Sequence, residues 1–212
     1  MLNNKHILCH RGLWNKVEQQ NTYHAIESAF RQGFGIETDI RDRDSNLVVS
    51  HDPSKSHNTL LLEDILDLYS NKYFESGLIG LNIKSDGISN DVNDLLNRYG
   101  IINYFTFDMS IPEMLRYKDA GLRYLTRLSE YETEPIMLDS AEGIWLDAFK
   151  TEWYDEKYII RLLGITEKVC IVSSELHGRD YKRQWSLLKK LNNHNNIILC
   201  TDKPNEAKEY FT

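Results

Sequence analysis

The chain has 212 residues, of which 41% are hydrophobic, and a net charge of −7 from 25 basic and 32 acidic residues. No run of lysines and arginines supplies the positive surface that broad nucleic-acid binding requires, so we expect no nucleic-acid partner. No stretch approaches 18 apolar residues, and the amino terminus lacks the apolar segment of a secretion signal. These features predict a cytoplasmic protein with no membrane span, built as a single domain over residues 1–212.

The cysteines support this assignment. Cys9, Cys170 and Cys200 are odd in number, lack the spacing of a metal site, and each lies within an apolar run. We therefore predict buried free thiols in a reducing compartment.

Short apolar runs alternate with amphipathic stretches along the whole chain. Strand candidates cover residues 6–9, 36–40, 46–50, 78–83, 104–107, 123–126, 143–147, 168–173 and 197–200. Helical spacing and end signals predict helices over residues 22–33, 59–70, 90–100, 110–121, 153–164 and 180–193, with a short helix from Pro204. This alternation is typical of a parallel sheet with helical crossovers.

The connection over residues 41–45 is too short for a parallel crossover, so 36–40 and 46–50 should pair antiparallel as a hairpin. Setting 46–50 aside leaves eight parallel strands, the number in a TIM barrel. We therefore predict an α/β fold, a compact (β/α)8 TIM-type barrel with a β-hairpin after its second strand. Some helices must then be brief or missing, and an open doubly wound sheet is the structural alternative.

Active groups of such barrels lie where the strands end. At the predicted ends stand His10 and Arg11, Glu37 and Asp39, His51 and Asp52, Asn82 and Lys84, Asp147, then Glu175, His177 and Arg179, and finally Asp202. Each alone has an ordinary interpretation; Asp202, for example, is most simply a helix cap or turn residue. Together they suit metal-assisted phosphoryl chemistry, which uses carboxylates for a hard cation, cations for phosphate oxygens and histidines for proton transfer.

The order of these motifs resembles the glycerophosphodiester phosphodiesterases, barrel enzymes of the phosphatidylinositol-phospholipase-C-like superfamily. The match is dense over residues 6–84 and sparse afterwards. It consists of His10-Arg11-Gly12, Asn21-Thr22, Gly35-Ile36-Glu37-Thr38-Asp39, Val48-Val49-Ser50-His51-Asp52 and Asn82-Ile83-Lys84, with a closing Thr201-Asp202-Lys203-Pro204 turn.

The resemblance implies a hydrolase of lipid metabolism that cleaves small glycerophosphodiesters to glycerol 3-phosphate and an alcohol. It also implies a bound divalent cation, Mg²⁺ or Ca²⁺. The implied roles are His10 and His51 as the acid–base pair, Arg11 and Lys84 on the phosphate oxygens, and Glu37, Asp39 and Asn82 on the metal. Which histidine is the acid and which the base stays open.

Two positions depart from the family pattern. The family usually has glutamate where this chain has Gln20 and Asn82, and the glutamate at the second position is a metal ligand. An amide oxygen still ligates a hard cation but removes one negative charge, so weaker metal binding is expected. The alternatives are a catalytically weakened barrel that binds a phosphorylated polyol or sugar without turnover, and a lyase that forms a cyclic phosphodiester.

The later half of the chain bears on the substrate. Trp145 and His177 are predicted near the mouth of the barrel, where polar residues with one aromatic suit a hydrophilic alcohol better than a lipid tail. We predict that both contact the substrate, and the alternative for Trp145 is packing against a helix.

Overall fold

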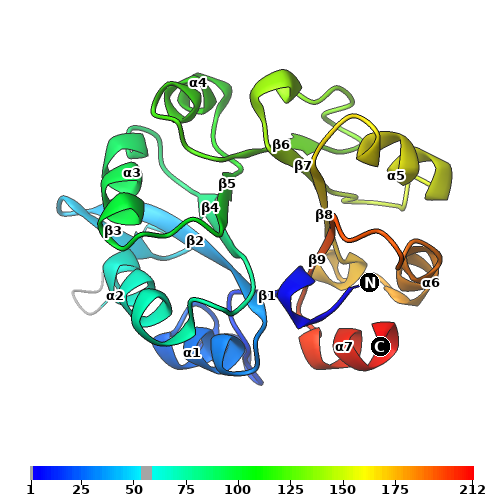
Figure 1. Ribbon diagram of the computed structural model, residues 1–212, viewed down its shortest axis with the longest axis horizontal. Helices are drawn as coiled ribbons and strands as arrows, with labels where there is room; N and C mark the ends of the chain where they lie inside the picture. Colours follow the sequence, from blue (N-terminus) through cyan, green and yellow to red (C-terminus); the bar gives the residue numbers. More distant parts are fainter. Residues whose placement is uncertain (1, 54–58) are drawn as a thin grey trace.

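The computed structural model describes residues 2–53 and 59–212. Eight parallel strands form its centre and helices surround them (Figure 1). The strands are β1 (Ile7–His10), β2 (Gly35–Arg43), β4 (Ile79–Ile83), β5 (Tyr104–Phe107), β6 (Leu125–Leu128), β7 (Gly143–Leu146), β8 (Lys168–Val172) and β9 (Ile197–Thr201). They follow the order β5-β4-β2-β1-β9-β8-β7-β6. A bridge between Thr106 and Tyr124 joins β5 to the chain entering β6, so the barrel is nearly closed, and the predicted TIM-type fold is confirmed.

Strand β3 (Asn46–Val49) lies outside the barrel order and pairs antiparallel with the end of β2, as the sequence predicts. The turn between them consists of Asp44 and Ser45, whose φ angles are 49° and 64°. Positive φ angles at both central positions are those of a type I′ turn, whose twist matches that of the flanking strands. The hairpin therefore extends β2 beyond the barrel mouth.

The helices are α1 (Tyr23–Arg31), α2 (Leu62–Leu68), α3 (Ser89–Arg98), α4 (Ile111–Asp119), α5 (Glu156–Leu163), α6 (Lys182–Lys190) and α7 (Pro204–Phe211). The chain between β6 and β7 has only a short 3₁₀ turn, Leu138–Ser140, where a full barrel has a helix. Ser110 caps α4 by accepting a hydrogen bond from the backbone of Glu113, as its capping motif predicts. No helix in the described part of the chain is long and apolar enough to cross a membrane.

The predicted sixth strand was placed too early in the chain. Residues 123–126 were expected, whereas β6 spans Leu125–Leu128, and Arg123 and Tyr124 instead make the contacts that bring the chain to β5. Helices α1 and α4 also end earlier than predicted, because each stops before a glycine in the left-handed conformation, Gly33 (φ 76°) and Gly121 (φ 71°).

Alternation along the strands divides the core into an inner and an outer layer. Leu8, Cys170 and Cys200 belong to the cluster that fills the barrel, whereas Cys9 belongs to the core between strands and helices. All three cysteines are buried and free, as predicted. Cys9 follows Leu8 and points to the opposite face of β1, away from the layer that holds Cys170 and Cys200.

Replacing any of the cysteines with alanine should leave turnover nearly unchanged. Burial raises the pKa of each thiol, so the nucleophilic thiolate is not formed near neutral pH. The free energy of unfolding should fall by about 1 kcal/mol, the usual cost of removing a small buried group. Denaturant titration and an activity assay check this, and a large loss of turnover in a folded Cys9→Ala variant would contradict it.

Candidate active site

Polar side chains replace the apolar inner layer at the carboxyl ends of β1, β2 and β4. His10 pairs with Glu37 in the strand register, and Asp39 pairs with Asn82. Glu37, Asp39 and Asn82 are 1%, 0% and 9% exposed. Strand alternation therefore brings the four side chains to one face at the barrel mouth, which is where the sequence places them.

His10 is held between two carboxylates. Its Nδ1 lies 2.7 Å from Oδ1 of Asp202, and its Nε2 lies 3.8 Å from Oε2 of Glu37. Burial lowers the pKa of His10, but the hydrogen bond to Asp202 and the negative charges of Glu37 and Asp202 outweigh it, so the pKa is raised overall. The pair fixes Nδ1 as the donor to Asp202 and leaves Nε2 for proton exchange on the Glu37 side.

Asp202 was predicted at the end of the last strand only as a cap or turn residue, with no role of its own in the site. It does lie in the turn before α7, whose N-cap is Lys203, but its carboxylate is the partner of His10. The backbone N–H of Asp202 donates to Oε1 of Glu175 at 3.1 Å, and the Thr201 hydroxyl donates to the same oxygen. Glu175 thus stabilises the turn in which Asp202 contacts His10.

Asp202→Asn should lower the pKa of His10. The substitution removes a negative charge and replaces a strong hydrogen-bond acceptor with a neutral amide. Both changes destabilise the protonated form of the imidazole relative to its neutral form. The limb of the pH–rate profile that belongs to His10 should therefore move to lower pH. An NMR titration of the imidazole in the variant checks the direction, and an unchanged or higher pKa would contradict the assigned pair.

Arg11 lies beside Asp39 because the chain turns sharply after β1. Its φ of 58° is left-handed, its N–H donates to the backbone oxygen of Glu37 at 2.8 Å, and its Nε lies 2.9 Å from Oδ2 of Asp39. A Cβ on the adjacent Gly12 would lie 2.8 Å from the backbone carbon of Ala25, so the glycine permits close packing on α1. The His-Arg-Gly sequence is therefore a structural requirement of the turn as well as a source of charge.

Asn21 and Gln20 complete the surroundings of this ion pair. The Asn21 amide donates to Oδ2 of Asp39 at 2.9 Å and accepts from the Thr38 hydroxyl at 2.8 Å. Gln20 accepts a hydrogen bond from Nη1 of Arg11 at 3.3 Å. Asn21 was predicted only as part of the Asn21-Thr22 motif, without a role, whereas its side chain orients the buried Asp39.

Lys84 connects Asp39 to a second group of charges. Its Nζ lies 3.1 Å from Oδ2 of Asp108 and 3.6 Å from Oδ1 of Asp39. Asp108 also forms an ion pair with Arg127, which in turn pairs with Glu132. A network of alternating charges therefore runs from β2 to the end of β6, and its members beyond Lys84 were not predicted.

Glu37 and Asn82 form a buried pair on the neighbouring strands β2 and β4. The Asn82 amide nitrogen donates to Oε1 of Glu37 at 3.0 Å. Burial, reinforced by the charge of Asp39, raises the pKa of Glu37 above its ordinary value, against the opposing charge of His10. Oδ1 of Asn82 and Oδ1 of Asp39 are both buried and accept no hydrogen bond.

Unsatisfied buried oxygens next to a carboxylate suit a hard divalent cation, which takes carboxylate and amide oxygens as ligands. Within residues 2–53 and 59–212, no three His, Cys, Asp or Glu side chains converge as a metal site. Asn82 would therefore have to complete a site with Glu37 and Asp39. The residues present fit a cation, with two charged ligands.

His51 follows β3 and is far more exposed than these residues. Its side chain is 49% exposed, and its Nδ1 lies 2.9 Å from Oδ1 of Asp52. No hydrogen bond or ion pair links it to His10 in the described part of the chain. Its role as the second proton-transfer group stays a prediction.

His177 and Trp145 occupy different levels of the barrel. Nε2 of His177 lies 2.7 Å from Oδ1 of Asp147, and the ring centroid of His177 is 4.9 Å from that of Phe149. Trp145 is 6% exposed and stacks on Phe107 inside the barrel at 3.8 Å, and not against a helix. Contact of either residue with a substrate stays a prediction. For Trp145, packing on Phe107 in the barrel interior already accounts for the aromatic side chain.

No family model matches the chain, and no curated protein is significantly similar to it. Solved structures do share its fold. A glycerophosphodiester phosphodiesterase from Agrobacterium tumefaciens has a TM-score of 0.68 at 16% identity, covering 99% of both chains. One from Parabacteroides distasonis has a TM-score of 0.65 at 16% identity, covering 99% of this chain and 97% of its own.

A Ca²⁺-dependent phosphatidylinositol-specific phospholipase C from Streptomyces antibioticus also aligns, with a TM-score of 0.54 at 11% identity, covering 95% of this chain and 96% of its own. At such identities the likeness shows the shared fold. The family resemblance predicted from the motifs is thus confirmed for the barrel architecture, and the chemistry has to be argued from the site.

Proposed function

We propose that this protein is a metal-assisted phosphodiester hydrolase that releases glycerol 3-phosphate, or a related phosphomonoester, and an alcohol. The observation that carries the proposal is the His10–Asp202 pair standing beside buried Glu37 and Asp39, with Arg11 and Lys84 next to the same carboxylates. A titratable imidazole with a raised pKa, surrounded by fixed charges at a barrel mouth, is typical of catalytic sites.

Arg11 and Lys84 supply positive charge for the phosphate oxygens. Their side chains are 23% and 17% exposed, so both reach the surface of the mouth while resting on Asp39. Guanidinium groups hold phosphate oxygens through directed hydrogen bonds, and ammonium groups act as point charges. The two groups would orient the diester and stabilise the charge that develops on it.

His10 transfers a proton through Nε2, because Nδ1 is committed to Asp202. As the general base, His10 takes a proton from the attacking water. As the general acid, it gives a proton to the departing alkoxide. His51 is proposed as the partner that performs the opposite transfer. Its exposure and its position on the loop after β3 suit a group that meets the substrate from above the mouth.

Glu37, Asp39 and Asn82 are the residues proposed to hold Mg²⁺ or Ca²⁺. A bound cation of this kind polarises a phosphoryl oxygen. Asp39 is also shared with Arg11, Asn21 and Lys84, so its charge is partly neutralised within the protein. The metal affinity should therefore be modest.

Asn82→Glu should tighten binding of Mg²⁺ or Ca²⁺. The variant restores a third charged ligand at a position where the wild-type amide contributes only a neutral oxygen, and ligand charge sets the affinity for hard cations. Asn82→Ala should weaken binding. Calorimetric titration compares the three proteins, and an unchanged or weaker dissociation constant for Asn82→Glu would remove Asn82 from the metal site.

A second candidate function is a barrel that binds a phosphorylated polyol or sugar without turnover. The observation that favours it is the neutralisation of Asp39 by two cations, which leaves a good anion site and a poor metal site. A screen of phosphodiesters with Mg²⁺, Ca²⁺ or EDTA, measuring the released alcohol, distinguishes the two. Release that depends on added cation supports the hydrolase, and binding without release supports the second candidate.

A further inference from the structure

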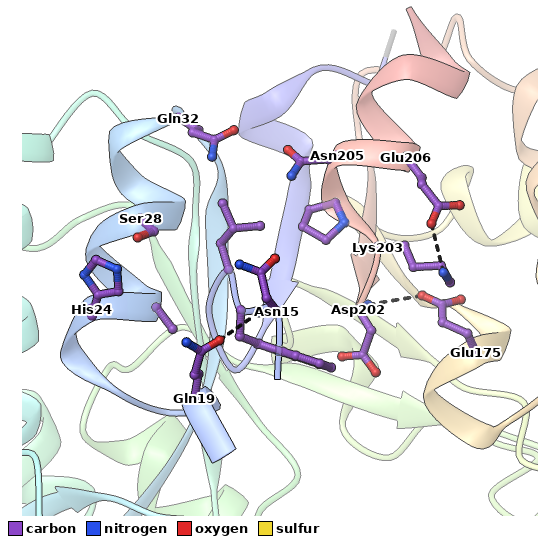
Figure 2. Close-up of a pocket in the computed structure, with 14 residues that line it drawn as sticks. Asn15, Gln19, His24, Ser28, Gln32, Glu175, Asp202, Lys203, Asn205 and Glu206 are labelled. Atoms are coloured by element: carbon purple, nitrogen blue, oxygen red, sulfur yellow. Dashed lines mark hydrogen bonds and ion pairs between the residues drawn. The ribbon is translucent and has the colours of Figure 1, made fainter. Parts of the chain in front are cut away.

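A groove of ≈ 750 Å³ runs between α1 and α7, beside the barrel mouth (Figure 2). His24 and Ser28 line it from successive turns of α1, Gln32 lines it from the C-cap of that helix, and Asn205 faces them from α7. The spacing of four residues places the α1 side chains on one face of the helix. The groove is as large as a typical small-molecule site, which spans about 300–1,000 Å³.

Four polar side chains in this groove have unused hydrogen-bonding capacity. In the described part of the chain, no hydrogen bond or ion pair engages the side chains of His24, Ser28, Gln32 or Asn205. Amides and hydroxyls each offer both a donor and an acceptor, and an imidazole offers at least one donor in either protonation state. A ligand group that also donates and accepts, such as a hydroxyl, matches all four.

The charged residues of the groove already have hydrogen-bond or ion-pair partners. Lys203 pairs with Glu206 at 2.9 Å. Glu175 accepts from Thr201 and from the backbone of Asp202, and Asp202 accepts from His10. No spare cation is left for a phosphate group, so the groove favours a neutral ligand.

Trp14 joins the groove to the catalytic region. Its ring lines the groove, and its indole Nε1 donates to the backbone oxygen of His10 at 2.9 Å. The hydrogen bond fixes the orientation of the ring, whose apolar surface suits the C–H face of a sugar or polyol. Asp202 likewise lines the groove while holding His10.

We propose that the groove between α1 and α7 is a binding site for a neutral polyhydroxylated group, a sugar or polyol. Two sources carry this chemistry: the alcohol part of the diester, which rests on the proposed function, or a free sugar or polyol that acts on His10 through Trp14 and Asp202. Binding itself does not depend on turnover.

The direct test follows the Trp14 indole signal in ¹H–¹⁵N NMR during titration with myo-inositol, sorbitol or glucose. The Trp14 signal, assigned with Trp14→Phe, should shift saturably with a dissociation constant on the order of 1 mM, as expected for a small ligand. The indoles of Trp145, Trp153 and Trp185 serve as internal references, and glucose 6-phosphate and cyclohexanol should bind at least about tenfold more weakly.

Ser28→Phe places a ring in the middle of the groove without touching the proposed catalytic residues. Arg31→Phe on the same helix is the matched control, because Arg31 pairs with Glu27 and does not line the groove. Ser28→Phe should abolish the shift, and Arg31→Phe should retain it. The absence of any saturable shift in the wild type, or equal binding by both variants, would overturn the proposal whether or not the protein hydrolyses diesters.

Kinetics then separate the two sources. If the groove takes the substrate's alcohol, Ser28→Phe should raise KM for glycerophosphoinositol about tenfold or more and leave glycerophosphoethanolamine unchanged, and free inositol should compete. If the ligand is free, inositol should change turnover of glycerophosphoethanolamine without competing. Both results support the site and assign its ligand, and an identical response of Ser28→Phe and Arg31→Phe to both diesters and to inositol would contradict it.

Discussion

His10→Ala should lower kcat for diester hydrolysis by about 10²–10⁴-fold, the usual contribution of general acid–base catalysis. The imidazole is the group whose position is most strongly fixed by its neighbours, with Asp202 on Nδ1 and Glu37 near Nε2. Its removal takes away the proton-transfer group and leaves Arg11 and Lys84 to bind the phosphate. KM should therefore change far less than kcat.

His194→Ala is a suitable control, because His194 lies at the opposite end of the barrel, before β9. His51→Ala tests the second half of the proposed pair and should lose a similar factor. If His10→Ala falls by 10²-fold or more and His51→Ala by only a few-fold, the first assignment holds and another group performs the second transfer. A loss of only a few-fold in both would mean that both histidines are structural.

Glu37→Gln should weaken divalent-cation binding by about 100-fold or more, beyond the 10–100-fold typical of losing a residue that merely supports a ligand. Glu37 is one of only two charged candidate ligands and is almost fully buried. EDTA should correspondingly remove most of the wild-type turnover. Calorimetry with Mg²⁺ and Ca²⁺ measures the affinity directly.

The pH dependence of this binding provides a second check. A cation binds the carboxylate form, and the pKa of Glu37 is raised, so affinity should increase as the pH rises through that pKa. Glu209→Gln, an exposed change on α7, should bind like the wild type. Undiminished binding by Glu37→Gln would place the cation elsewhere.

The inner face of the site could be predicted because strand periodicity decides it. Glu37 and Asp39 are two residues apart on β2, and Asn82 lies opposite Asp39 on β4. The two-residue period of a strand and the order of the strands are therefore enough to place all three side chains on one face. The hairpin after β2 followed from the length of its connection alone.

The contacts that position His10 and Asp39 could not be predicted in the same way. Asp202 is 192 positions from His10, and only barrel closure brings β9 beside β1. Asn21 reaches Asp39 because its backbone is left-handed, a conformation that no local pattern announces. The packing of Trp145 on Phe107 likewise depends on the side-chain layers of the finished barrel.

The most direct measurement is ³¹P NMR of a glycerophosphodiester incubated with the protein and Mg²⁺ or Ca²⁺. In the wild type the diester signal should be replaced by that of glycerol 3-phosphate, and His10→Ala should give at most about one hundredth of that rate. A cyclic phosphodiester signal would assign the reaction to a lyase. Loss of diester at the same rate in the wild type and in His10→Ala, or no loss with any diester and either cation, would mean that the His10 site does not cleave phosphodiesters.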